Sequence, residues 1–356
     1  MLPWMSRLAP LCLFALSTVA GAAPLAPPDA GIDGLMQRYD GRVPGAAVLV
    51  LKDGQPVFRR GYGLAVVEDG TPVSPATNFR LASVSKQFTA AAILLLAEDG
   101  RLSIDDPLKK WLPGLPAVAD AMTLRQLLSH TSGLLDYEDL MDPADTRQVH
   151  DIDVLHLLQK ENRTYFAPGS SYRYSNSGYA LLALVVGKAS GSDFASFLRQ
   201  RIFLPLGMTA TFAHQDGVDE VPERAYGYSQ IDGHWQRTDQ STTSAVLGDG
   251  GIYSSIDDLA KWDAALYDER LLRRASLQQA FSAATATSEP DVPHYGFGWR
   301  INGDALWHSG ESIGFRNVIV RYPKQKLTVV VLSNRNGPEP YALALQIARR
   351  WLAPGQ

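Results

Sequence analysis

Apolar runs near both ends of the chain predict the strands of one sheet. Residues 46–52, "AAVLVLK", and 55–63, "QPVFRRGYG", flank Asp53-Gly54, a dipeptide that favours the positive φ angles of a two-residue hairpin turn. Toward the C-terminus, further strands are predicted at 295–301, 304–310, 315–322 and 326–334, with a turn at Pro323. The apolar spacing within 341–352, "YALALQIARRWL", favours a terminal helix packed on this sheet.

The middle of the chain has a helical pattern instead. Helices are predicted at 123–130, 151–160, 177–190, 193–203 and 254–267, and several of them open on a Ser, Thr or Asp residue that is able to cap a helix. Antiparallel strands from both ends with helices between them predict an α+β fold. The sheet region is expected at about 30–82 and 290–356 and the helical insertion at about 100–250, with a cleft where they meet.

The most apolar helix is predicted at 83–100, "SVSKQFTAAAILLLAEDG", which contains no Gly or Pro before Gly100. Ser83 is expected in its first turn, where free N–H groups and the helix dipole favour developing negative charge. Lys86 shares that face, although a lysine is disfavoured at a helix N-terminus and costly to bury. An ammonium there helps a serine to lose its proton. Alone, the spacing also fits a capping serine beside a solvated lysine.

The first thirty residues combine Arg7, an apolar stretch from about Leu8 to Ala20, and small residues after it. This pattern predicts a secretory signal peptide at 1–22, leaving a periplasmic or secreted domain at 23–356. The alternative, a membrane anchor, is disfavoured because the apolar run is shorter than the ~20 residues that span a bilayer. The only cysteine, Cys12, lies inside this run, so the mature chain would carry no thiol, which suits an oxidising compartment.

Composition narrows the expected partners. Apolar residues make up 46% of the chain and charged residues 20%, as is ordinary for a globular protein. The formal net charge of -4 indicates no basic face for nucleic acid. No later segment is long and apolar enough to predict a stable membrane span. The expected partner is therefore a small-molecule or peptide substrate, and the sequence carries no signal for an oligomeric state.

Two further motifs accompany Ser83-x-x-Lys86. Tyr174-Ser175-Asn176 lies on the loop before a predicted helix, and His308-Ser309-Gly310 ends a predicted strand. With "LLSHTSGL" at 127–134 and "GDGGIYSSIDDLAKW" at 248–262, this ordered set resembles the class C β-lactamases and the D-alanyl-D-alanine carboxypeptidase-like, penicillin-binding serine hydrolases. The resemblance runs from about Asp33 to the terminal helix and implies a β-lactamase/transpeptidase-like fold.

The resemblance implies an acyl-transfer reaction that needs no cofactor. Ser83 would attack a carbonyl to form an acyl-enzyme that water hydrolyses, and Lys86 and Tyr174 would act as a coupled proton-transfer pair, with the general base left open between them. The backbone N–H groups of Ser83 and Glu311 would form the oxyanion hole. Asn176 would hold Lys86 and the substrate amide. Gly310 is expected to let its strand approach the substrate closely.

The chain departs from the serine penicillin-recognising signature S-x-x-K, S-D-N and K-T-G at two motifs. Tyr174 replaces the middle serine, as in the class C branch. His308 replaces the third-motif lysine and is expected to hydrogen-bond Tyr174 or a substrate carboxylate. Without a fixed cation there, the resemblance favours a hydrolase of D-amino-acid-containing peptides or small esters, with weak β-lactam hydrolysis, over a dedicated class C-like β-lactamase.

Several alternatives stay in view. Residues 310–314, "GESIG", match the nucleophile elbow with Ser312 as nucleophile, but the elbow needs a strand-turn-helix and a later histidine, and neither is predicted. His130 is interpreted as structural, Ser85 and Tyr137 are expected near the pocket, and no histidine spacing indicates a metal site. A non-catalytic penicillin-binding or peptide-sensing module is the alternative from another class.

Overall fold

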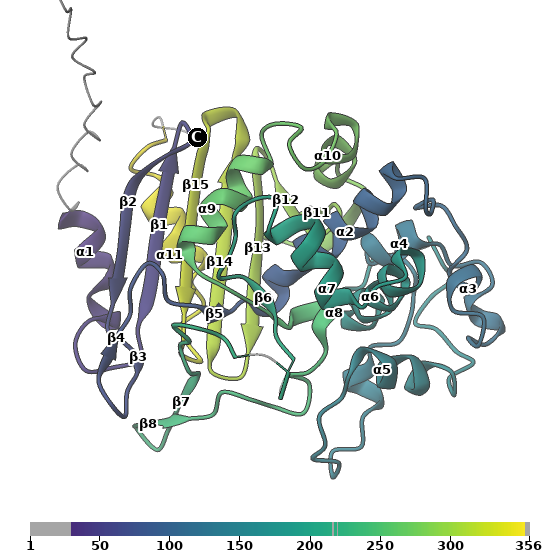
Figure 1. The fold of residues 1–356 in the computed structure, drawn as a ribbon, viewed down its shortest axis with the longest axis horizontal. Helices are drawn as coiled ribbons and strands as arrows, with labels where there is room; N and C mark the ends of the chain where they lie inside the picture. The colour runs from purple at the N-terminus through teal and green to yellow at the C-terminus, as the bar shows by residue number, and fades with distance from the viewer. Residues whose placement is uncertain (1–29, 216, 219, 353–356) are drawn as a thin grey trace, which may run out of the picture.

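The computed structural model describes residues 30–215, 217–218 and 220–352. The strands of the main sheet are β1 Ala46–Lys52, β2 Gln55–Tyr62, β10 Thr285–Glu289, β11 Val292–Tyr295, β12 Arg300–Asn302, β13 Ala305–Ser312, β14 Phe315–Tyr322 and β15 Leu327–Ser333. Within the described ranges these eight strands form one antiparallel sheet in the order β10-β11-β12-β13-β14-β15-β1-β2 (Figure 1). The N-terminal hairpin therefore extends a sheet of C-terminal strands, which confirms the predicted α+β fold. The predicted signal peptide lies outside the described residues.

Helices and short strands fill the rest of the chain. The α-helices are α1 Ala30–Met36, α2 Lys86–Glu98, α3 Leu108–Trp111, α4 Leu124–Leu128, α5 Asp151–Leu158, α6 Asn176–Ser190, α7 Phe194–Leu198, α8 Leu247–Gly250, α9 Ile256–Ala265, α10 Arg274–Phe281 and α11 Tyr341–Ala348. Tighter or wider turns are η1 Gln37–Tyr39, η2 Ala82–Ser85, η3 Ala117–Ala119, η4 Tyr137–Leu140, η5 Arg199–Phe203 and η6 Pro323–Gln325. The short strands are β3 Leu64–Val66, β4 Thr71–Pro72, β5 Phe79–Arg80, β6 Phe212–Ala213, β7 Tyr228–Ile231, β8 His234–Arg237 and β9 Ile252–Ser254.

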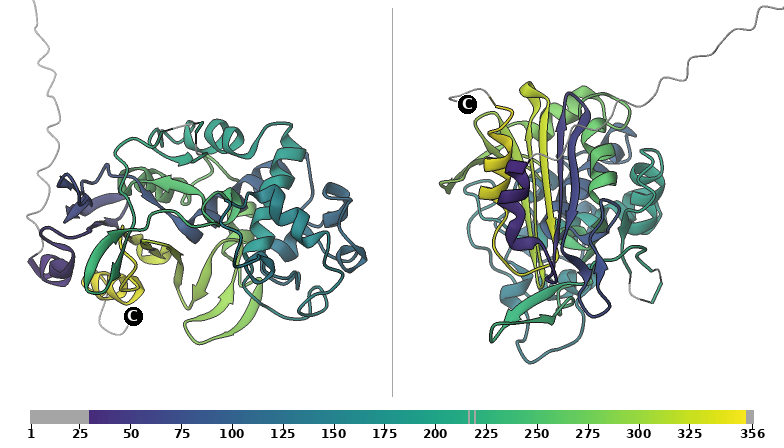
Figure 2. Two further views of the ribbon diagram at one scale, coloured as in Figure 1. Left: turned by 90° about the horizontal axis from the view of Figure 1, so that it is seen from below. Right: turned by 90° about the vertical axis from the view of Figure 1, so that its left-hand side faces the viewer.

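The central strands are buried on both faces. Along β15, Val329 and Val331 belong to the core beneath α1 and α11, whereas Val330 and Leu332 belong to the core that includes α2. The layers are visible edge-on in Figure 2, with α1 and α11 on one side of the sheet and the other helices on the opposite side. A strand covered on both faces needs apolar residues at every position, which explains the unbroken run in this segment.

The predicted hairpin turn is confirmed, since Asp53 and Gly54 have φ angles of 52° and 77° between β1 and β2. The predicted strand at 295–301 is only partly confirmed: Arg300 and Ile301 lie in β12, which pairs with β13, but β11 ends at Tyr295 and a turn through Gly298 (φ 75°) precedes β12. A Cβ at Gly298 would lie 2.9 Å from the carbonyl oxygen of Lys86, so the turn requires glycine where it packs on α2.

The helix predicted at 83–100 is also divided differently. Ser83 lies in the 3-10 turn η2, and Lys86 is the first residue of α2, which ends at Glu98 with Gly100 at φ 69° beyond it. Ser83 is therefore not in the first turn of the α-helix, as the pattern predicted. Strand β10 begins before 290, and α9 and α10 lie beyond 250, so the helical part of the chain is longer than expected.

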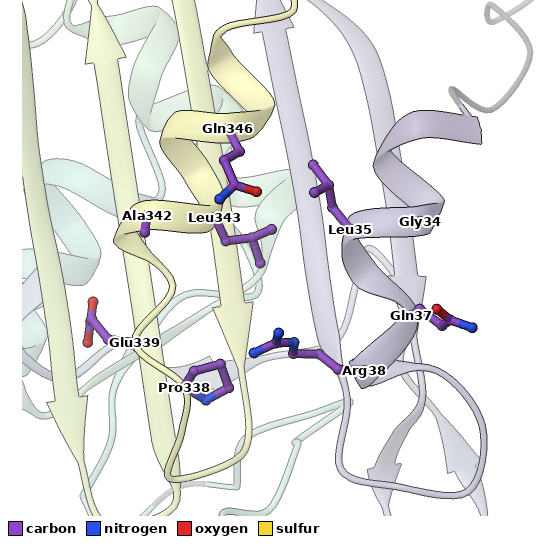
Figure 3. A pocket seen from close by; sticks show the side chains of 9 residues that line it. All are labelled: Gly34, Leu35, Gln37, Arg38, Pro338, Glu339, Ala342, Leu343 and Gln346. Carbon is purple, nitrogen blue, oxygen red and sulfur yellow. The ribbon is translucent and has the colours of Figure 1, made fainter.

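A groove of about 600 Å³ lies between α1 and α11, on the sheet face away from α2 (Figure 3). Its lining residues are Gly34, Leu35, Gln37, Arg38, Pro338, Glu339, Ala342, Leu343 and Gln346. None of them belongs to the three motifs. In the part of the chain that the structure describes, no single helix is long and apolar enough to cross a membrane, and the one adjacent pair that reaches this length is bent by 75°.

Candidate active site

Lys86 is buried and makes three hydrogen bonds at the start of α2. Its Nζ lies 3.0 Å from Ser83 Oγ, 2.8 Å from Asn176 Oδ1 and 2.9 Å from the carbonyl oxygen of Asp249. The side chain is 0% exposed. This burial contradicts the alternative interpretation of Lys86 as a solvated lysine. Burying an ammonium-bearing chain at a helix N-terminus is costly unless each donor is matched, as it is here.

The three partners also orient the amine. The carbonyl of Asp249 accepts only, and Asn176 Oδ1 accepts only, because the Nδ2 of the same amide donates to Glu138 Oε1 at 3.0 Å. A neutral Lys86 amine that donates both of its protons to these two acceptors turns its lone pair toward Ser83. The arrangement can therefore take a proton from the serine hydroxyl along a 3.0 Å path.

Strand β13 runs directly beside the η2 turn that carries Ser83. A Cβ added at Gly310 would lie 2.0 Å from the carbonyl oxygen of Leu81 and 3.3 Å from the backbone nitrogen of Ser83. Glycine is required here by the contact between the strand and the serine turn, which is a different reason from the expected approach to substrate. The next residue, Glu311, is thereby brought to the same cavity as Ser83.

The cavity above Ser83 has a volume of about 50 Å³. It is lined by Arg80, Ala82, Ser83, Tyr137, Glu138, Asn176, Thr243, Asp249, Gly250, Glu311 and Ser312. Tyr137 is therefore at the pocket, as predicted. Ser85 is not among the lining residues; it is fully buried and its Oγ accepts a bond from the Ile252 N–H at 3.2 Å.

Asn176 holds Lys86 and lines the cavity, as its predicted role requires. It is the first residue of α6 and its backbone N–H donates to Asp136 Oδ2 at 2.7 Å, which fixes the loop carrying Tyr174 and Asn176. Its side-chain oxygen holds Lys86, and one of its two amide N–H groups donates to Glu138 Oε1, which leaves the second N–H for a substrate. Glu138, which the sequence reasoning missed, lines the cavity together with Asn176.

The Tyr174 ring, but not its hydroxyl, contacts the lysine. Lys86 Nζ lies 4.9 Å from the centre of the Tyr174 ring and 5.5 Å from that of Tyr179, distances at which a cation is attracted to an aromatic face. The Tyr174 hydroxyl is buried and has no hydrogen-bond partner among the described residues. The Lys86 amine therefore contacts Ser83, as predicted. The Tyr174 oxygen forms no hydrogen bond with either Ser83 or Lys86.

His308 has neither of its expected partners. It is 0% exposed, so it cannot contact a substrate carboxylate directly, and its ring centre lies 6.1 Å from that of Tyr174. Its Nδ1 lies 2.6 Å from the Ser309 carbonyl and its Nε2 2.9 Å from the Tyr295 hydroxyl. Nδ1–H therefore donates to the carbonyl, and the Tyr295 hydroxyl donates to Nε2. Burial, reinforced by the Arg300 and Lys86 cations, holds the His308 pKa well below its usual range.

His130 lies in the same aromatic cluster, beneath Tyr174. Its ring centre is 4.3 Å from that of Tyr174, its Nδ1 accepts from the Ser175 N–H at 3.2 Å, and its carbonyl accepts from the Arg173 N–H at 3.0 Å. Burial, with Lys86 and Arg300 nearby, holds its pKa well below the usual range. These contacts agree with the interpretation of His130 as a structural residue.

The sequence analysis assigned no role to Asp249, which lies in the motif "GDGG", yet this residue contributes to the site in two ways. Its carbonyl holds Lys86, and its carboxyl lines the cavity and accepts from the Tyr137 hydroxyl at 3.1 Å. Burial, opposed by Lys86 and reinforced by Asp151, raises the Asp249 pKa to about 7. The only sequence signal for Asp249 was a polar residue between glycines. That it contacts Lys86 is visible only in the fold.

Arg300 is a third residue, after Glu138 and Asp249, that the sequence did not single out. Its Nη1 donates to Ser309 Oγ at 2.9 Å, beside the third motif. Across the described ranges it has no carboxylate within salt-bridge distance, and its Nε is buried without a partner. A cation with uncommitted charge therefore lies next to the strand residue that follows His308.

The alternative nucleophile Ser312 does not have the geometry of an elbow. It is the last residue of β13, pairs with Phe315, and is followed by the tight turn into β14 rather than by a helix. No group of three or more His, Cys, Asp or Glu side chains among the described residues is arranged to hold a metal ion.

Known proteins resemble this chain over most of its length. A family model described as "Beta-lactamase" matches residues 29–350. The chain is 34% identical over 329 residues to penicillin-binding protein 4* of Bacillus subtilis (strain 168), covering 87% of this chain and 72% of that protein. It is 29% identical over 307 residues to protein flp of Staphylococcus aureus (strain NCTC 8325 / PS 47), covering 83% of this chain but only 60% of that relative. A solved penicillin-binding protein from Bacillus halodurans matches with a TM-score of 0.77 at 28% identity, covering 90% of this chain and 98% of that one.

Proposed function

We propose, from the premise that this chain belongs to the beta-lactamase family and is a serine hydrolase, that Ser83 is its nucleophile and Lys86 the base. The observation that carries the proposal is the 3.0 Å contact between Lys86 Nζ and Ser83 Oγ, next to a cavity that Ser83 and Glu311 line. Two acceptor-only partners turn the lysine lone pair toward the serine. Positioned bases of this kind activate hydroxyl nucleophiles.

In the proposed reaction the Ser83 O–H proton moves to Lys86 Nζ as Oγ bonds to the substrate carbonyl carbon. The resulting oxyanion accepts hydrogen bonds from the backbone N–H groups of Ser83 and Glu311. The faces of Tyr174 and Tyr179 stabilise the ammonium that forms. The leaving amine or alcohol takes a proton back, the carbon–nitrogen or carbon–oxygen bond breaks, and water later releases the acyl group from Ser83.

The proposed substrates are D-amino-acid-containing peptides, with small esters as a second class. A cavity of about 50 Å³ holds the reacting carbonyl and few further atoms, so the rest of the substrate would lie along the open cleft. The resemblance to proteins named as penicillin-binding supports acylation by penicillin at the same serine. The neutral, buried His308 supplies no cation in the third motif, so the carboxylate of a β-lactam, like that of a peptide, would depend on Arg300 beside Ser309.

Arg300 is expected to affect the binding of the two substrate classes differently. Beside Ser309 it would receive a terminal carboxylate, which peptides carry and simple esters lack. We expect Arg300→Gln to raise KM about ten-fold for a D-alanyl peptide with a free carboxylate, and to leave KM for a p-nitrophenyl ester within about two-fold. Equal changes for both substrates would contradict the assignment.

The direct experiment compares kcat/KM for D-alanyl peptides, nitrocefin and p-nitrophenyl esters in the wild type, Ser83→Ala and Ser85→Ala. Ser85 is the matched control, since it lies in the same 3-10 turn and points away from the cavity. Turnover that is lost only in Ser83→Ala supports the proposal. A stable adduct at Ser83 with no turnover of any substrate would favour the sensing module.

Export is proposed with the same function. Residues 1–22 have the charge, apolar run and small residues of a signal peptide, so the mature domain would begin at Ala23 and work outside the cytoplasm. The N-terminal sequence of the protein recovered from the periplasm or medium tests this. Recovery of the full-length chain in the membrane fraction would favour the anchor instead.

A further inference from the structure

Asp151 lies outside the three motifs, and nothing in the proposed mechanism uses it. It is the first residue of α5, it is 8% exposed, and both of its carboxylate oxygens are occupied. Oδ2 accepts from the Leu247 N–H and Oδ1 from the Gly248 N–H, each at 3.0 Å. Asp151 therefore grips the first two residues of α8 with a pair of charge-assisted hydrogen bonds.

The other side of α8 faces the lysine. The Gly248 carbonyl accepts from Thr89 Oγ1 at 2.7 Å, and the Asp249 carbonyl accepts from Lys86 Nζ at 2.9 Å. Thr89 and Lys86 are neighbours on α2, so two hydrogen bonds tie α8 to that helix while Asp151 holds it from α5. A turn of four residues has little rigidity of its own, and these contacts fix where its carbonyls point.

We infer that Asp151 is a positioning residue for Lys86: it fixes the α8 carbonyl that, with Asn176, turns the lysine amine toward Ser83. This rests on the proposed function of Ser83 and Lys86 and extends it to a residue that touches neither of them. Without the grip, the Asp249 carbonyl is free to shift, and the lysine loses one of the two acceptors that orient its lone pair. Rates in such sites fall steeply with small misplacements.

The electrostatics of Asp151 agree with a role beyond packing. Burial raises its pKa to about 6, and the two amides of α8 oppose that rise. The carboxylate is thus kept ionised at neutral pH in a place where a buried charge is costly. An apolar or amide residue would carry no such cost but could not accept from both N–H groups.

The test uses Asp151→Asn, with Asp258→Asn as the matched control. Asp258 is also buried (2% exposed) and also holds a distant backbone, accepting from the Ala210 N–H and the Thr211 hydroxyl at 2.9 Å, but its contacts do not lead to Lys86. In the full chain we measure labelling of Ser83 by a fluorophosphonate, the rate constant of Ser83 acylation by a p-nitrophenyl ester, kcat and KM for the best substrate of the panel, and Tm.

We expect Asp151→Asn to lower the acylation rate constant and kcat at least ten-fold, with KM within two-fold of wild type. Asp258→Asn should lower Tm at least as much while keeping acylation within two-fold. Thr89→Val removes the second tether and should give the same kinetic signature, about three-fold to ten-fold. The double variant should be less impaired than the product of the two single effects, because both tethers act on α8.

The outcomes separate the two hypotheses. If the wild type is not labelled at Ser83, the proposed function fails. If it is labelled and Asp151→Asn and Thr89→Val are acylated at the wild-type rate, the positioning role is overturned. Should Asp151→Asn not fold, Thr89→Val decides alone. If Asp151→Asn lowers Tm but leaves the acylation rate constant unchanged, the residue has a purely structural role, and the inference is again overturned.

Discussion

The two sides of the Ser83 site are held in different ways. We call the side with Lys86 and its partners the lysine wall, and the side with Tyr174, His308 and Tyr295 the aromatic wall. On the lysine wall, Lys86 Nζ has three hydrogen-bond partners between 2.8 and 3.0 Å, and one of them, the Asp249 carbonyl, belongs to α8, which Asp151 holds. On the aromatic wall, the Tyr174 hydroxyl is buried without a partner in the described chain, and His308 is turned away to Tyr295. The amine is fixed by hydrogen bonds, whereas the phenol is held by ring packing alone.

This difference bears on which group handles the proton. A base must be aligned with the hydroxyl that it deprotonates, and only the lysine has such alignment here. The aromatic wall contributes ring faces toward Lys86 Nζ, which stabilise a cation once it has formed. The following variants weigh the two walls against each other.

Removing the amine should have the largest effect. Lys86→Met keeps the length and burial of the side chain but removes the base and leaves the Asp249 carbonyl and the Asn176 oxygen unmatched. We expect kcat/KM to fall on the order of 10³-fold. The measurement is steady-state kinetics, with Lys261→Met as control, since that lysine is exposed on α9 and pairs with the buried Asp258, away from Ser83. A loss under ten-fold would refute the lysine as base.

Removing the phenol oxygen compares the walls directly. If Tyr174 relays protons, Tyr174→Phe should lower kcat by about 10²-fold. If its ring face is what matters, as the contacts favour, Tyr174→Phe should retain kcat within about ten-fold while Tyr174→Leu loses it. Both variants are compared by kcat and by urea unfolding. Tyr174→Phe should be as stable as wild type or more so, because an unpartnered buried hydroxyl is removed. Lower stability would mean that the hydroxyl has a partner in solution.

The carboxyl of the lysine wall predicts a pH dependence of stability. Since the pKa of Asp249 is raised to about 7, the folded protein keeps this proton up to higher pH than the unfolded chain does. Its contribution to stability is therefore fully present below about pH 4 and is lost as the pH rises through about 7, with a slope of about 1.4 kcal/mol per pH unit. Chemical denaturation between pH 4 and 8 measures this slope.

Asp249→Asn cannot titrate, so its stability curve should be flatter than that of the wild type over this range. Parallel curves for the two proteins would show that other groups cause the dependence.

The smallest effect is expected on the aromatic wall away from the cavity. Tyr295→Phe leaves His308 Nε2 without its donor and should lower the free energy of unfolding by about 1 kcal/mol. Activity should stay within about three-fold, because His308 touches neither Ser83 nor the cavity. A large loss of kcat with unchanged stability would show that His308 contributes to catalysis.

Much of the fold could be predicted because each strand is short and its turn chemistry is local. Asp53-Gly54 and the unbroken apolar run of β15 identify a hairpin and a doubly covered strand from a few residues each. The strand predicted across 295–301 was only partly correct because Gly298 serves a contact with Lys86 that is distant in sequence. Apolar periodicity carries no information about such long-range contacts.

The residues of the candidate site also fall into those that the sequence predicted and those that it missed. Ser83, Lys86 and Asn176 could be identified because the short motifs that contain them resemble those of a known family, and each motif lies at a turn or a helix start. Glu138, Asp249 and Asp151 were not, because each reaches the site through packing between elements far apart in sequence. Arg300 and the partner of His308 depend on strand pairing instead: Arg300 contacts Ser309 from the adjacent strand β12, and Tyr295 reaches His308 from β11, on the far side of β12.

Mapping of a fluorophosphonate adduct by intact mass and peptide sequencing tests the central claim most directly. The account predicts one adduct per wild-type chain, located on Ser83, absent in Ser83→Ala and unchanged in Ser312→Ala. An adduct on Ser312, or one that persists when Ser83 is replaced, would contradict it.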